Sequence, residues 1–512
     1  MTTIIKDAAD MFIEFKPSGD HLNGYVREAK RQPGSGKRNM AILKLGRVLD
    51  KERGIFFSKE RGIYTYTIEA GPTEATDEIL AEFSEHLNHA KTEIILRFGF
   101  SYIFDQAMKK IGLKNILQET FEEDFDSVIS IVMSRIEYGV ANQHIESYVK
   151  SSYAALLYPQ ARLASQQISN LYSRIGEEEV HRKFSSLYLP FLHKLSGQER
   201  HAVLIDSTGL ANCINIPLTA VNVHYGAKNN EIRLIYIVDK ALKLPIFFRY
   251  VPGNIVDVST LDHTIKEMKM NGINIDECIL DAGYLSIGGI KDLNNSKIQF
   301  IMRLKPNLKV YKELLTEHIP NLMTREFRVK FNERTLYVKK VETQIEDNNV
   351  YAYVCIDLNE FTKDLKVLED VDPKQDGLTD SEYEQERLKC GVFMLLSSKS
   401  LDTNDVIPFY YSRQIVEQVF DTAKNYANLL PIRCHSVETF RGHLLISFIT
   451  TAAITLLNQK LADYGNIHDA KAGLVNLFCK TYGNTVLVCE PDKRSKKIAE
   501  VLGLTIPKVI SP

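Results

Sequence analysis

The order of apolar runs after residue 200 constrains this sequence more than any other feature. Short apolar segments typical of strands alternate with segments of helical periodicity, in the order β-β-β-α-β-α-β. Two of the apolar runs end in an acid, Asp206 and Asp281. This order predicts an α/β domain in which helices flank a mixed sheet. The expected strands are residues 201–206, 233–238, 244–251, 277–281 and 298–303.

Length and composition place this domain in a larger globular chain. The 512 residues correspond to about three domains. Hydrophobic residues make up 44% and charged residues 25%, which excludes a disordered or fibrous chain. The formal net charge is only -2, so affinity for a polyanion must come from local basic patches.

A basic patch of this kind lies near the N-terminus. Residues 27–61 contain 11 Lys or Arg against 4 Asp or Glu. Apolar and basic residues interleave there between glycines, which predicts short strands. One interpretation is the solvated face of a small β module, and the other is contact with DNA phosphates. The predicted contacts are Arg31, Lys37 and Arg38.

Two further segments have open interpretations. Residues 163–175 combine short polar residues with spaced apolar ones, which fits a DNA-recognition helix or an ordinary packed helix. Residues 357–386 contain 11 acids and 3 lysines, which predicts a solvated acidic loop within a β-rich stretch. The predicted organisation is a basic β-rich DNA-binding module (1–77), a helical DNA-binding or linker region (78–198), a catalytic core (199–304 and 409–460), a β-rich insertion (305–408) and a helical C-terminal tail (461–512).

Cysteine usage and hydropathy predict a cytoplasmic protein. The seven cysteines are scattered without a CxxC pair, which favours a reducing compartment over a disulfide framework. The first residues lack the basic and apolar regions of a secretory signal. The most apolar stretch, residues 444–457, is too short to span a bilayer and indicates a buried helix.

A helix is predicted from Tyr410 onward, with a polar stripe on one side. At about 100° per residue, Tyr410, Arg413, Glu417 and Lys424 fall within about 60° of one another, opposite an apolar face. Taken alone, the stripe is typical of an exposed surface with an i,i+4 ion pair between Arg413 and Glu417.

Asp206 and Asp281 indicate a catalytic role for the stripe, because they can form a cluster of three carboxylates with Glu417. Carboxylates at the ends of adjacent strands can lie side by side, and a helix can supply the third. Such a cluster repels itself unless cations neutralise it. Hard oxygen ligands suit Mg²⁺, and a pair of such ions serves phosphodiester displacement.

Three sequence features resemble the signature of bacterial insertion-sequence DDE transposases, of the insertion-sequence-four type with a YREK motif. They are Asp206-Ser-Thr, the step from Leu280 to Tyr284, and the spacing Tyr410-(2)-Arg413-(3)-Glu417-(6)-Lys424. The resemblance covers roughly residues 90–460. Further matches are Gly226-Ala-Lys228, Leu244-Pro245, Gly253-Asn254 with Asp257, Phe300-Ile-Met-Arg303 and Arg441-Gly-His443.

The resemblance implies an RNase H-like mixed-sheet core, interrupted by a β-strand insertion before the glutamate helix. It implies that Asp206, Asp281 and Glu417 are the catalytic residues and hold two Mg²⁺ ions, with Mn²⁺ as a possible substitute. Tyr410, Arg413 and Lys424 would grip phosphates near the end of the element. The implied partners are double-stranded DNA, as terminal inverted repeats and target, and a second copy of the chain in a synaptic complex. The implied reaction is cut-and-paste transposition in a bacterial cytoplasm, at the nucleoid.

Two alternatives stay open at the level of sequence. Another two-metal nuclease on the same fold would cut DNA without joining it. A DNA-binding relic or repressor would do neither, although three intact acids argue against it. The chain has no tryptophan to hold a flipped base in a hairpin route. Possible replacements by stacking are Tyr284, Phe300, Tyr311 and Tyr411.

Overall fold

The structure is a computed structural model of the chain. It describes residues 11–19, 21–32, 35–80, 82–83, 94–212, 214, 216–224, 227–255, 257–370, 378–482 and 485–510. For residues 29–32, 35–41, 223–224, 227–229 and 482 it describes the backbone alone. The chain forms two compact units, residues 1–95 with 480–485, and residues 96–479 with 486–512.

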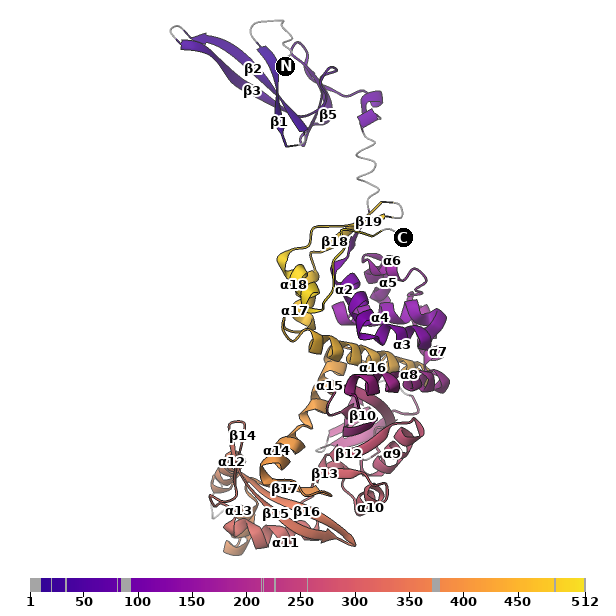
Figure 1. Cartoon of the computed structure of the whole chain (residues 1–512), viewed down its shortest axis with the longest axis vertical. Helices are drawn as coiled ribbons and strands as arrows, with labels where there is room; N and C mark the ends of the chain where they lie inside the picture. Colours follow the sequence, from indigo (N-terminus) through magenta and orange to yellow (C-terminus); the bar gives the residue numbers. More distant parts are fainter. Residues whose placement is uncertain are drawn as a thin grey trace. The chain divides into compact units, whose positions relative to one another are not determined.

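The N-terminal unit is an antiparallel sheet whose strands follow one another in chain order (Figure 1). Apolar residues on one face, among them Val26, Leu45 and Phe56, form its small core. Gly46 is required in β3, because its φ is +94° and a Cβ there would lie 2.3 Å from the Phe57 carbonyl oxygen. The strands are β1 (Met11–Ser18), β2 (His21–Gln32), β3 (Ser35–Asp50), β4 (Ile55–Ser58), β5 (Gly62–Thr67) and β6 (Gly71–Glu74).

A helical layer opens the second unit and packs against a long helix, α16 (Val437–Lys460), chiefly through α4 and α7 (Figure 1). Gly442 of α16 lets α7 approach closely, because a Cβ there would lie 2.0 Å from the Tyr172 carbonyl oxygen. The helices of the layer are α2 (Gly99–Ile111), α3 (Leu113–Phe121), α4 (Phe125–Tyr138), α5 (Asn142–Lys150), α6 (Ala154–Leu157), α7 (Ser165–Ile175) and α8 (Glu178–Ser196).

Helix α16 contains the apolar stretch that the sequence analysis placed in the core. It is 24 residues long, and by length and composition alone it could cross a membrane. In the structure, 89% of its most apolar window is buried inside the protein. This burial agrees with the predicted core helix.

A mixed ten-stranded sheet follows in the order β11-β10-β8-β12-β13-β17-β16-β15-β14, with β9 paired to β10. Strands β8, β12 and β13 are parallel to one another, and helices flank the sheet, so the predicted mixed α/β class is confirmed. The first half consists of β8 (Arg200–Ala211), β9 (Ala220–His224), β10 (Ala227–Asp239), β11 (Pro245–Pro252), α9 (Leu261–Met270), β12 (Asn274–Leu280), α10 (Ile287–Asn295) and β13 (Gln299–Arg303).

The stretch between β13 and the glutamate helix continues the same sheet. Strand β17 pairs with β13 on one side and β16 on the other. The predicted acidic loop at 357–386 is wrong for the described residues, which form two helices, because Asp357 and Thr379 cap them. The elements here are α11 (Lys309–His318), β14 (Arg328–Phe331), β15 (Arg334–Ile345), β16 (Asn348–Asp357), α12 (Leu358–Glu369), α13 (Asp380–Lys389) and β17 (Val392–Ser397).

The chain ends in a small segment that contains both helices and strands, so the predicted helical tail is only partly helical. The four-stranded sheet there has the order β20-β19-β18-β7. Its elements are β7 (Ile94–Arg97), α17 (Ile467–Leu474), β18 (Phe478–Tyr482), β19 (Thr485–Val488), α18 (Lys493–Val501) and β20 (Val509–Ile510).

A buried polar network joins the helical layer to the region that follows the glutamate helix. Arg135 of α4 donates to the carbonyl of Ala427 at 3.1 Å, and its guanidinium also contacts Nδ1 of His443 at 3.2 Å. His443 Nε2 lies 3.0 Å from the carbonyl oxygen of Leu429. These contacts require a neutral imidazole that accepts at Nδ1 and donates at Nε2. Burial and the nearby Arg135 charge lower the pKa of His443 to about 3.

Acidification from pH 7 to pH 5 is therefore expected to cost about 2 kcal/mol of stability through His443. The folded state keeps this histidine neutral while the unfolded chain binds a proton near pH 6.5, so this stability is present above about 6.5 and is lost as the pH falls. Urea unfolding at both pH values should show a smaller loss for His443→Gln than for the parent chain. Equal losses would contradict the prediction.

Candidate active site

The segment with the polar stripe forms two helices instead of the single predicted helix. Helix α14 (Thr403–Tyr411) ends before Ser412, and α15 (Gln414–Asn425) begins after Arg413. The backbone tightens at the junction, where the N–H of Arg413 donates to the carbonyl of Tyr410. Tyr410 and Glu417 therefore come from different helices.

The two aspartates lie on neighbouring parallel strands. Ile205 of β8 pairs with Leu280 of β12, which places Asp206 and Asp281 side by side. Asp281 follows the last residue of β12, as predicted. Asp206 does not end its strand, because β8 continues to Ala211 and pairs along its length with β10.

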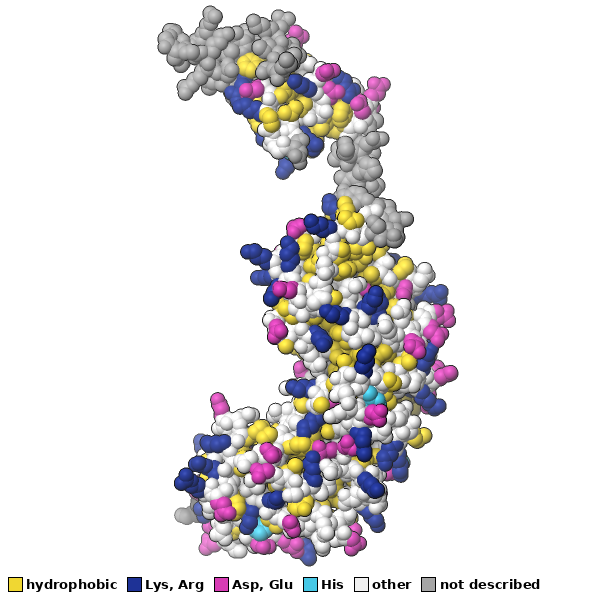
Figure 2. Space-filling view, in the orientation of Figure 1, with side chains coloured by type: hydrophobic (Ala, Val, Ile, Leu, Met, Phe, Trp, Pro, Cys, Tyr) yellow, Lys and Arg dark blue, Asp and Glu magenta, His cyan; other side chains and the backbone are white. Residues whose placement is uncertain are grey.

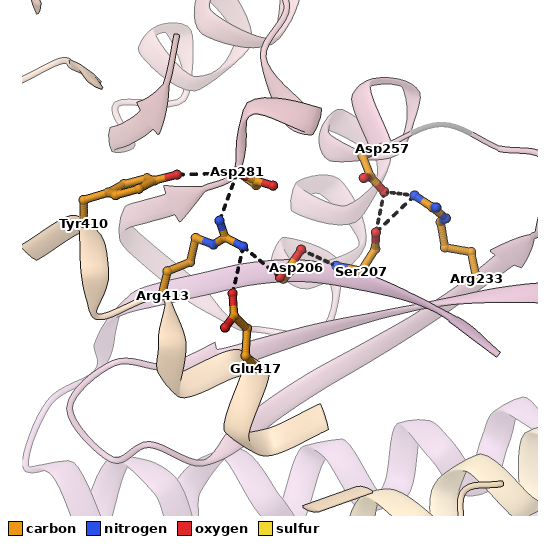
Figure 3. A network of polar contacts seen from close by, with 8 residues as sticks. All are labelled: Asp206, Ser207, Arg233, Asp257, Asp281, Tyr410, Arg413 and Glu417. Atoms are coloured by element: carbon orange, nitrogen blue, oxygen red, sulfur yellow. Dashed lines mark hydrogen bonds and ion pairs between the residues drawn. The ribbon is translucent and has the colours of Figure 1, made fainter. Parts of the chain in front are cut away.

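Arg413 connects all three predicted catalytic acids (Figure 3). Its Nη1 donates to Asp281 Oδ1 at 2.9 Å, while Nη2 lies 3.5 Å from Asp206 Oδ2 and 3.1 Å from Glu417 Oε1. The Tyr410 hydroxyl donates to Asp281 Oδ1 at 3.4 Å. The fold thus gathers four of the predicted site residues around the guanidinium of a fifth, Arg413.

Solvent exposure differs sharply among the three acids. The side chain of Asp206 is 15% exposed, whereas those of Asp281 and Glu417 are 40% and 57% exposed. Burial raises the pKa of Asp206 to about 6, and the charges of Asp281 and Asp257 add to this shift against the opposing effect of Arg413. The site therefore concentrates negative charge at a partly desolvated carboxylate, where a cation is strongly favoured.

A second polar cluster supports the strand that carries Asp206. Ser207 Oγ donates to Asp257 Oδ1 at 2.6 Å, and Arg233 Nη1 donates to the same oxygen at 2.8 Å (Figure 3). The backbone N–H of Ser207 also donates to Asp206 Oδ1 at 2.8 Å. In the sequence, Asp257 is a family match only, and its support of β8 is not apparent there. Its only sequence signal was the Gly253-Asn254 and Asp257 pattern.

Lys424 lies one step away from the acids, near the end of α15. Its Nζ donates to Thr208 Oγ1 at 2.6 Å, two residues beyond Asp206 on β8. Burial lowers the pKa of Lys424, and the nearby charge of Glu231 opposes that shift. Because Gly209 has no Cβ, the Glu231 carboxylate packs directly against it. The contact with Thr208 therefore holds the Lys424 side chain against β8, the strand that carries the buried Asp206.

The remaining predicted site residues lie in the N-terminal sheet. Arg31 belongs to β2, and Lys37 and Arg38 belong to β3, with Lys30 paired to Arg38 across the two strands. Their side chains lie outside the described residues. Their proposed contact with DNA stays a prediction.

The candidate stacking residues divide into core and surface. Tyr284, Phe300 and Tyr311 are buried. Tyr411 is partly exposed and stacks on Phe331 with ring centroids 5.3 Å apart. Of the four, only Tyr411 is placed to offer part of its ring to a ligand.

The chemistry of the three acids suits a divalent cation, although the described residues contain no group of three or more His, Cys, Asp or Glu arranged to hold a metal ion. The three carboxylates do not form such a group because the guanidinium of Arg413 lies among them. Their oxygens converge on one positive charge, and carboxylate oxygens are the ligands that Mg²⁺ prefers. The donor set therefore fits such an ion.

Comparison with known proteins identifies the family of this chain. A family profile described as "Transposase DDE domain" matches residues 197–452, which include all three acids. No curated protein matches. A solved structure described as the cryo-EM structure of a piggyBac transposase synaptic complex with hairpin DNA has 13% identity and a TM-score of 0.37, covering 74% of this chain and 70% of that one. Since the family match spans half of the chain, the chain belongs to the transposase DDE-domain family and is a DDE transposase, a polynucleotidyl transferase.

Proposed function

We propose that this transposase carries out cut-and-paste transposition, cleaving DNA at terminal inverted repeats and joining the freed ends to a target. The observation that carries the proposal is the convergence of Asp206, Asp281 and Glu417 on Arg413. The YREK spacing supports the insertion-sequence-four type. In this reading β8 to β13 with α15 form an RNase H-like core, and residues 305–408 are its insertion.

Asp206, Asp281 and Glu417 are the residues that would hold the metal, which we propose to be two Mg²⁺ ions with Mn²⁺ as a substitute. Bound ions of this kind lower the pKa of a nucleophile and stabilise the leaving oxygen. Strand β8 fixes the first acid, the end of β12 fixes the second, and α15 brings the third. The Ser207–Asp257–Arg233 cluster keeps Asp206 in place.

Arg413, Tyr410 and Lys424 are proposed to position the DNA phosphate. Arg413 offers a planar fork that matches two phosphate oxygens, and a Lys ammonium offers a point charge. The acids that now bind Arg413 would be neutralised by cations, which frees the guanidinium for the phosphate. Negative charge on the substrate is then balanced beside the reacting group.

The proposed partners are double-stranded DNA and a second copy of the chain in a synaptic complex, within a bacterial cytoplasm at the nucleoid. On the face shown in Figure 2, Lys and Arg side chains are interspersed with Asp and Glu. This mixed surface agrees with the net charge of -2, so we expect DNA affinity to come from local basic sites.

A mini-element assay tests the proposed function. The gene's flanking sequence supplies the candidate inverted repeats, and a marker between them is offered with a supercoiled target plasmid and Mg²⁺. We expect excision and integrated product, both lost with a chelator and restored by Mn²⁺. Cleavage without joining would favour a nuclease, and binding without cleavage would favour a repressor.

The N-terminal basic residues give a separate prediction about end binding. Replacing Arg31, Lys37 and Arg38 together by alanine should lower the slope of log affinity against log salt by up to about 2.7, because each phosphate contact contributes about 0.9. Fluorescence anisotropy with an end fragment at several salt concentrations measures this slope. An unchanged slope would assign the patch to a solvated face.

A further inference from the structure

A polar cavity of about 400 Å³ lies beyond the end of the glutamate helix. Its walls are the ends of α4 and α5, one face of α7, residues 428–434 and the first turns of α16. Of the described residues that line it, none is Asp or Glu, while two are arginines and several carry hydroxyl or amide groups. Such a lining offers hydrogen-bond donors and positive charge without a carboxylate to satisfy them.

Arg135 supplies a buried charge at this cavity. Its side chain is among the largest fully buried ones, and all its hydrogen bonds go to neutral groups, such as the Tyr172 hydroxyl at 2.8 Å and Ser447 Oγ at 2.9 Å. Among the described carboxylates, none pairs with it, and its Nε has no hydrogen-bond partner. A buried charge without a counter-ion is costly, so an anion in the cavity would be stabilised.

Two helices also begin at the cavity without a side-chain cap. Helices α5 and α7 have Ala141 and Ala164 at their N-caps, and neither alanine has a side chain that can accept a hydrogen bond. Neither first turn contains an acid. A helix N-terminus without a side-chain cap, at the positive end of the helix dipole, favours a phosphate at this position.

The segment that follows the catalytic helix α15 forms part of the cavity wall. Arg433 lines the cavity and is exposed, and no described carboxylate forms an ion pair with it. Asn428 holds the same segment by donating to the Val140 carbonyl at 3.0 Å. From Glu417 to the end of α15 is about 12 Å, the length of three to four base pairs. DNA bound at the three acids therefore extends to the end of α15, next to the segment that forms the cavity wall.

We propose that this cavity binds one backbone phosphate of the element's end, a few nucleotides from the cleaved bond. The inference rests on the proposed function. Arg433 and the hydroxyls of Ser165 and Ser169 contact the phosphate oxygens, and Arg135 supplies positive charge from the buried side of the cavity. Helix α7 thereby acquires a role, which the sequence of residues 163–175 left open. Its apolar side packs on α16, and its polar side contacts phosphate rather than reading bases.

The test uses the full-length chain carrying Asp281→Asn, which prevents cleavage during binding. We expect Arg433→Ala to weaken binding of an end fragment three- to tenfold and to lower its salt slope by about 0.9. Ser169→Asp, which places an acid in the cavity, should weaken binding at least tenfold. The matched control is Arg174→Ala on the same helix, because Arg174 pairs with Asp124 at 2.5 Å. The control should bind as the parent does.

A second arm separates a DNA phosphate from a free anion. End fragments with one neutral methylphosphonate linkage are scanned across the first positions. One position should reproduce the loss of Arg433→Ala, with no further loss when both changes are combined. Inorganic phosphate should compete only at concentrations far above those of DNA. Unchanged affinity and slope in both variants, or submillimolar phosphate binding abolished by Arg433→Ala with DNA binding unchanged, would overturn the proposal.

The failure of this inference can be told apart from failure of the proposed function. The Arg433 and Ser169 variants are also made in the chain with Asp281 intact and tested in the mini-element assay. Normal excision and DNA binding by both variants would overturn only the phosphate site. An intact parent chain that neither cuts nor joins DNA would overturn the proposed function itself.

Discussion

Replacing Glu417 by glutamine is expected to reduce strand cleavage by at least about 10³-fold, equivalent to roughly 4 kcal/mol in the barrier. The amide keeps the size of the side chain and removes the negative charge that a metal ligand needs. Asp206→Asn and Asp281→Asn should have the same effect. Cleavage of a labelled end fragment measures the rate, and anisotropy should show end binding within a few-fold of the parent.

The matched control for this series is Asp421→Asn. Asp421 lies one turn beyond Glu417 on α15, is exposed, and accepts from Asn425 at 2.6 Å. It should cleave at the parent rate. Near-parental cleavage by any of the three acid variants would remove that residue from the proposed site.

Arg413→Ala is expected to have two separable effects. With a chelator present, the variant should unfold more easily by about 2 kcal/mol, because three clustered carboxylates lose a charged partner whose side chain is only 18% exposed. With saturating Mg²⁺ that loss should shrink, while cleavage stays at least about tenfold below the parent because the phosphate is misplaced. Arg413→Lys should recover little activity, since an ammonium cannot reproduce the fork.

The control for Arg413 is Arg200→Ala. Arg200 joins the same two strands at their other end, where its Nε lies 2.5 Å from Asp276 Oδ1, and it is 59% exposed. It should change neither stability nor cleavage measurably. If Arg413→Ala behaves in the same way, the arginine is a surface residue and the YREK match is a coincidence of helix chemistry.

Several features followed from the sequence because they depend on short-range patterns. Apolar runs of strand length alternating with helical periodicity determined the mixed α/β class. The positions of Asp206 and Asp281 in two of those runs, and the spacing from Tyr410 to Lys424, selected the candidate residues. Each of these signals lies within a few residues of the chain, where side-chain alternation and helical pitch are regular.

Tertiary structure decided how those residues meet. The pairing of β8 with β12 sets Asp206 beside Asp281 across 75 residues of sequence, and the tight junction at Arg413 turns its guanidinium toward both and toward Glu417. The same is true of Arg135, whose partners Ala427 and His443 lie 292 and 308 residues further along the chain. Strand register and long-range packing depend on which surfaces bury each other, and no local periodicity encodes that choice.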